Sequence, residues 1–159
     1  AIIFGLVFLY FKFIYFLRDK PYPATLIFLI FVFNFFLTIF SFYFLSKIFE
    51  DKINWKSFVI TFSYSLFPTL VWFLSTSILY IFLPPPRTLS LLGKGFSIFF
   101  IAFSLSLLIW KLILIYLAVR FSSKQNVLRI FYMIILYLTW FLPYSLFLYH
   151  LRFFRIPFI

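Results

Sequence analysis

Few residues of this chain have the chemistry that catalysis or metal binding requires. Its 159 residues contain one His, three acidic residues and no Cys. The single His, His150, has no acidic residue near it in sequence, whereas a metal site needs several clustered ligands. The sequence contains no paired carboxylates within an apolar segment and no glycine-rich phosphate loop. We therefore predict no catalytic, cofactor-binding or metal-binding residues, and a protein that is not an enzyme.

Lys111 is the one charged residue deep within an apolar segment, residues 95–119. A lysine at the centre of a bilayer costs about 2.5–3.5 kcal/mol on insertion scales. Two interpretations are open. The side chain extends to the membrane surface, or it makes a polar contact inside a helix bundle, with the Tyr64 hydroxyl or with a carbonyl freed by a proline. The apolar segments contain no carboxylate, which argues against a proton relay.

Polar and proline residues recur at helical spacing within the other apolar segments. Pro68 and Pro143 each remove one backbone hydrogen bond from a helix, so they are either hinges or static kinks. One polar stripe comprises Asn34, Thr38 and Ser41, and another comprises Tyr132, Thr139, Pro143 and His150. The candidate bundle-interior or hinge residues are Asn34, Tyr64, Pro68, Lys111 and Pro143.

The composition is that of an integral membrane protein. Hydrophobic residues make up 66% of the chain and charged residues 11%, against about 25% charged residues in soluble domains. A soluble fold of this size would expose an apolar surface that aggregates. The net charge of +11 would suggest nucleic acid as the partner of a soluble protein. Here the basic residues separate apolar segments, so we expect contact with lipid headgroups and no nucleic acid.

The apolar segments predict an all-α fold, a single membrane domain over residues 1–159 with about five transmembrane helices. A bilayer core about 30 Å thick needs about 20 apolar residues as a helix. The short connections favour antiparallel neighbours in one bundle. The predicted spans are residues 1–17, 24–46, 57–83, 95–119 and 127–151, and Asn126 is the expected N-cap of the last one.

The Lys and Arg residues are divided evenly between the two sides of this arrangement, so the positive-inside rule predicts no orientation. Each side has six. The second and fourth connections contain Lys47, Lys52, Lys56, Arg120, Lys124 and Arg129, and the opposite side contains Arg18, Lys20, Arg87, Lys94, Arg152 and Arg155.

Two adjacent segments resemble a known family. Residues 52–58 read KINWKSF, a basic loop, and residues 61–68 read TFSYSLFP, a helix with a Tyr-Ser-x-x-Pro element. Downstream, WKL at 110–112 and AVRFS at 118–122 follow in similar order. This pattern, over roughly residues 24–151, resembles the Yip1 family of multi-pass membrane proteins. The resemblance implies five spans, a cytosolic N-terminus, cytosolic second and fourth connections, and no catalytic residues.

The leading functional hypothesis is a non-catalytic scaffold or trafficking protein of the Yip1 type. The resemblance implies that such a protein acts through helix–helix contacts with other integral membrane proteins, in homo- or hetero-oligomers within the lipid bilayer. One alternative is an accessory membrane subunit of a larger respiratory or transport complex. Another is a small transporter, for which Pro68, Lys111 and Pro143 are the relevant residues.

Overall fold

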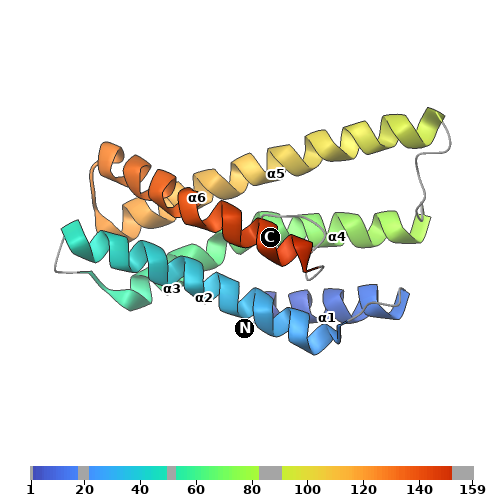
Figure 1. Cartoon of the computed structure of the whole chain (residues 1–159), viewed down its shortest axis with the longest axis horizontal. Helices are drawn as coiled ribbons and strands as arrows, with labels where there is room; N and C mark the ends of the chain where they lie inside the picture. The colour runs from blue at the N-terminus through green and yellow to red at the C-terminus, as the bar shows by residue number, and fades with distance from the viewer. Residues whose placement is uncertain (1, 18–21, 50–52, 83–90, 152–159) are drawn as a thin grey trace.

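The described part of the chain consists of helices joined by short connections. The computed structural model describes residues 2–17, 22–49, 53–82 and 91–151, and these ranges contain no strand. The all-α prediction is therefore confirmed. Figure 1 shows the six helices, which are α1 (Ile2–Leu17), α2 (Ala24–Phe49), α3 (Trp55–Tyr64), α4 (Leu66–Phe82), α5 (Leu91–Ser123) and α6 (Val127–His150).

Four of the five predicted spans correspond to helical segments that are long and apolar enough to cross a membrane. The helix in the first predicted span, α1, has 16 residues and is shorter than the others. Since about 20 residues span a bilayer core, α1 is below the usual length. The four long segments are Ala24–Phe49, Trp55–Leu79, Leu91–Ser123 and Val127–His150.

The predicted span 57–83 is interrupted close to Pro68, the residue predicted to be a hinge or a static kink, although a division into two helices was not predicted. Helix α3 ends at Tyr64 and α4 begins at Leu66. At the junction, the Ser65 hydroxyl donates to the Phe62 carbonyl at 2.7 Å, and the Ser65 N–H donates to the same carbonyl at 3.0 Å. Pro68 has no N–H to offer the Tyr64 carbonyl. It lies in the first turn of α4, where a proline costs little.

The start of α3 is set by a cap that was not predicted from the sequence. The Asn54 side chain accepts a hydrogen bond from the Lys56 N–H at 3.0 Å, and the helix begins at Trp55, two residues before the predicted start. Asn126 does occupy the N-cap position of α6, but its side chain makes no capping hydrogen bond. The sequence therefore identified the position of the second cap but not its hydrogen bonding.

Helix α5 extends beyond the predicted span 95–119 at both ends. Its 33 residues correspond to about 50 Å, much longer than a bilayer core. It ends where Lys124 adopts a left-handed conformation, with φ of 51°. A Lys or Arg near a helix end does not stop a helix, because its long side chain can reach water while the backbone continues. The helix therefore continues four residues past each end of the predicted span, through Lys94 and Arg120.

The helices pack around a core rich in phenylalanine. Helix α1 lies against α2 and α4, while α5 contacts α3, α4 and α6 (Figure 1). The ring of Phe73 stacks on Tyr10 at 4.1 Å, and that of Phe42 lies 4.7 Å from Tyr137. Such aromatic pairs add to the packing energy beyond the area they bury. The most buried large side chains are Phe42, Phe58, Phe62, Phe73, Ile39 and Ile130.

Candidate functional site

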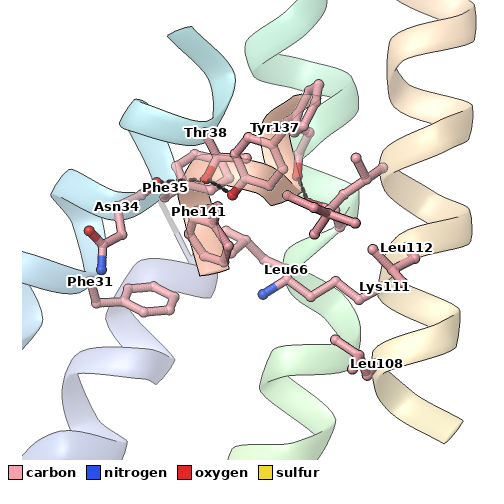
Figure 2. Close-up of a pocket in the computed structure, with 14 residues that line it drawn as sticks. Phe31, Asn34, Phe35, Thr38, Leu66, Leu108, Lys111, Leu112, Tyr137 and Phe141 are labelled. Atoms are coloured by element: carbon pink, nitrogen blue, oxygen red, sulfur yellow. Dashed lines mark hydrogen bonds between the residues drawn. The ribbon is translucent and has the colours of Figure 1, made fainter. Parts of the chain in front are cut away.

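Lys111 lies where two cavities of the bundle meet. In Figure 2 its side chain extends away from α5 towards Leu66, into the space that both residues line. Leu108 and Lys111 line both cavities. Lys111 is partly buried, and no described residue is acidic or accepts a hydrogen bond from its Nζ. The ammonium group is therefore directed into the bundle without a counter-charge in the described part of the chain.

The first cavity lies inside the bundle and has a volume of about 80 Å³. It has room for several water molecules, since one water needs at least about 10–15 Å³ by this measure. Most of its wall is apolar, with side chains from α2, α5 and α6 among others (Figure 2). Its polar or charged lining residues are Asn34, Thr38, Ser65, Lys111 and Tyr137.

Two hydrogen bonds join α2 to α6 at the wall of this inner cavity. The Thr38 hydroxyl donates to the Asn34 carbonyl at 2.9 Å and lies 2.9 Å from the Tyr137 hydroxyl. Since the Thr38 proton is already donated, Tyr137 is the donor in the second bond. The Tyr144 hydroxyl donates to Asn34 Oδ1 at 2.7 Å. These groups satisfy one another, so they form a structural polar contact and leave Lys111 out.

The second cavity is a groove of about 340 Å³ between α4 and α5. Within it, Trp72 Nε1 donates to the Ser104 hydroxyl at 3.1 Å, and Ser104 donates to the Phe100 carbonyl at 2.8 Å. These two side chains therefore satisfy each other. Thr69 is only 6% exposed, and its hydroxyl makes no hydrogen bond with any described residue. The groove thus contains one polar group without a partner among the described residues, the Thr69 hydroxyl, whereas the Lys111 ammonium extends towards Leu66 and the inner cavity.

The break between α3 and α4 contributes to both cavities. Ser65 lines the inner cavity and Pro68 lines the groove. Both residues are buried. A Pro at the start of α4 fixes the backbone there, because its ring restricts φ. The local sequence that interrupts the helix therefore also shapes the walls around Lys111.

The five residues singled out from the sequence do not come together in one site. Asn34, Pro68 and Lys111 line the two cavities. Tyr64 is 68% exposed and Pro143 is also exposed, so neither lies in the bundle interior. Tyr64 is the last residue of α3, where the helix ends and its side chain faces away from the neighbouring helices.

The polar stripe predicted for the last span lies on the wrong face of α6. Tyr132, Thr139, Pro143 and His150 are all exposed. The buried face instead contains Ile130, Met133, Tyr137, Ser145 and Leu148. Tyr137 and Tyr144 were not predicted as interior residues, because their role depends on partners in α2. The seven-residue spacing of Tyr137 and Tyr144, which places both on one face of the helix, is the sequence feature that could have identified them.

No group of three or more His, Cys, Asp or Glu residues that could hold a metal ion occurs among the described residues. His150 is exposed at the end of α6. No protein-family model, curated protein or solved structure matches this chain. The class of the protein therefore follows from its helices. Four helical segments in the described part of the chain are long and apolar enough to cross a membrane.

Proposed function

We propose that this chain is a non-catalytic integral membrane protein that acts as a scaffold. It would work through helix–helix contacts with other membrane proteins, as the resemblance to the Yip1 family implies. The N-terminus would be cytosolic, together with the connections after α2 and α5. The proposal does not include catalysis, because the sequence offers one His and three acidic residues, none of the acidic ones within an apolar segment.

The observation that carries the proposal is the exposed apolar surface of α5. This helix has 33 residues, and only 11% of its most apolar stretch is buried. Contiguous apolar surface of this kind marks a membrane or protein interaction site. Exposed side chains along α5 include Ile98, Phe99, Ile101, Leu105, Ile109, Trp110 and Ile113. Lipid or a partner helix can cover this face, whereas water cannot cover it without a large free-energy cost.

The residues that carry the family resemblance also have a structural role, which supports retaining the family as part of the proposal. The Tyr64–Pro68 element coincides with the break between α3 and α4. Burial of Ser65 and Pro68 at this break gives a physical reason for both residue types. A scaffold needs a defined helix arrangement of this kind, since its partners recognise shape within the membrane.

Site-specific photo-crosslinking in the native membrane tests the scaffold proposal. A photoreactive phenylalanine at Phe99 or Ile113, both exposed on α5, is expected to give the same crosslinked integral membrane protein. The matched control is Ile115, which is buried on the same helix and should crosslink only within the chain. Crosslinks to lipid alone, with a monodisperse monomer after mild purification, would contradict the proposal. Recovery with cofactor-bearing subunits would favour an accessory subunit instead.

A small transporter is a second candidate, favoured by the two cavities that meet at Lys111. Such a protein would move an anion past the ammonium group of Lys111. Proteoliposomes containing the wild-type chain would then take up labelled anions, and Lys111→Leu would abolish uptake. Equal uptake by both proteins, or none by the wild type, would remove this candidate.

A further inference from the structure

We propose that the end of α2 and the start of α6 form a binding site for the headgroup of an anionic phospholipid. The headgroup phosphate is held by Lys47, Lys124 and Arg129, and the acyl chains lie on the apolar side chains next to them. This inference requires that the chain is embedded in a membrane, but it does not rest on the scaffold function.

Two contacts bring the end of α2 and the start of α6 together. Gln125 Nε2 donates to the Ser46 carbonyl at 3.0 Å, and Arg129 Cζ lies 5.6 Å from the centre of the Phe49 ring. The second contact is within the range of a cation–π interaction. Figure 1 shows the end of α2 and the start of α6 at the same end of the bundle. The last turn of α2 therefore lies against the segment that begins α6.

Three basic side chains surround this contact and are free to bind a ligand. Lys47 follows Ser46 in the sequence, Lys124 precedes Gln125, and Arg129 lies in the first turn of α6. All three are exposed. A guanidinium group can bind two phosphate oxygens at once, and a lysine ammonium acts as a further point charge.

The charge of this end of the bundle determines the kind of headgroup. Residues 47–56 and 120–129 contain six basic residues and two acidic ones, Glu50 and Asp51, which lie outside the described residues. The excess of positive charge favours an anionic headgroup, because clusters of Lys and Arg beside a membrane-spanning helix attract anionic lipids. A zwitterionic headgroup would bring its own cationic group close to three others.

Apolar side chains beside the three cations favour a lipid over a soluble anion. Four exposed apolar residues are adjacent in sequence to this contact, namely Ile48, Phe49, Val127 and Leu128. Acyl chains cover such a surface, whereas a soluble anion does not. The ring of Trp55 packs edge to face on Tyr43 of α2 at 5.2 Å. Trp and Tyr are enriched at the headgroup level of membranes, which supports the same depth for this end of the bundle.

Native mass spectrometry of the full chain in a non-ionic detergent tests this proposal. Dioleoylphosphatidylglycerol and dioleoylphosphatidylcholine are added separately, and we expect the anionic lipid to bind at least about tenfold more tightly. Arg129→Gln should weaken its binding about fivefold, since one basic residue near a membrane surface contributes about 1 kcal/mol. The triple variant with Lys47→Gln and Lys124→Gln should bind both lipids equally.

Lys94→Gln is the matched control, because Lys94 is exposed near the opposite end of α5. It should leave the tightest binding of phosphatidylglycerol unchanged. The substituted residues are exposed, so every variant should retain the helix content of the wild type by circular dichroism. Equal binding of the two lipids by the wild type, unchanged affinity of Arg129→Gln, or an equal loss in Lys94→Gln would each overturn the proposal. Displacement of the lipid by inorganic phosphate would indicate a site for a free anion and would also overturn it.

Discussion

The Tyr144 hydroxyl of α6 donates a 2.7 Å hydrogen bond to Oδ1 of Asn34 in α2, although the two residues are 110 positions apart. Asn34 is buried and Tyr144 is partly buried. In lipid, where apolar surfaces gain little from association, such contacts help to select one arrangement of helices. This bond and the nearby Thr38–Tyr137 pair define how α2 and α6 meet.

Removing the hydroxyl of Tyr144 should destabilise the bundle modestly. We expect Tyr144→Phe to lower the free energy of unfolding by about 0.6 kcal/mol, the average for polar contacts between membrane helices, and by no more than about 1.7 kcal/mol, the largest value measured. Reversible unfolding in sodium dodecyl sulfate, followed by circular dichroism, measures this change. Tyr132→Phe is the control, because Tyr132 is exposed on the same helix. A double-mutant cycle with Asn34→Leu should be non-additive, and additive effects would contradict a direct bond.

The contact between α3 and α5 can be tested with an engineered disulfide. Thr61 Oγ1 lies 2.7 Å from Ser122 Oγ, so cysteines at these positions come close enough to form a bond. The chain contains no Cys, so the thiols of the pair Thr61→Cys with Ser122→Cys are the only ones that the reagent can label. Mild oxidation should protect both cysteines from a maleimide reagent after denaturation. The pair Thr61→Cys with Phe121→Cys should remain reactive, because Phe121 is 71% exposed. Equal protection of both pairs would argue against this packing.

Pro68→Ala should straighten the junction between α3 and α4. Alanine restores the N–H that can bond to the Tyr64 carbonyl, so the helix can continue through Ser65. Spin labels at Ile60→Cys and Leu74→Cys, both exposed, should approach the distance of an uninterrupted helix, about 21 Å along the axis. Pulsed electron paramagnetic resonance measures this distance with and without the substitution.

Labels at Leu29→Cys and Phe40→Cys, both exposed on α2, provide the control and should not respond to Pro68→Ala. If the distance distribution between the labels on α3 and α4 is the same before and after the substitution, Pro68 is not the cause of the break.

Membrane embedding predicts a pattern of aqueous accessibility. Thr61 of α3 bonds to Ser122 near the end of α5, so Lys56 at the start of α3 and Lys124 just after α5 lie towards the same end of the bundle. Lys56→Cys and Lys124→Cys should both react with an impermeant maleimide from one side of a sealed vesicle. Ile109→Cys, in the middle of α5, should react from neither side. Labelling of Ile109→Cys, or of the two lysine positions from opposite sides, would contradict the proposed membrane arrangement.

Helix content and approximate helix positions were predictable because they follow from local properties. Runs of about 20 apolar residues between basic or proline-rich connections predicted α2, α5 and α6. Their ends were less predictable. Asn54 sets the start of α3 through a hydrogen bond to Lys56, and Lys124 ends α5 through a left-handed backbone conformation. Both depend on the geometry of one or two residues, which hydrophobicity does not report.

The amino-acid order alone was enough for the class of fold, because burying twenty apolar residues in lipid requires a helix whose backbone bonds are internal. The sequence did not show which of those helices pack against one another. In α6 the polar residues at helical spacing proved exposed, while Tyr137 and Tyr144 turned inward because α2 presents Thr38 and Asn34 to them. The inward orientation of Lys111 likewise depends on cavities formed by several helices. Such contacts join residues far apart in the chain, and only the packed bundle brings them together.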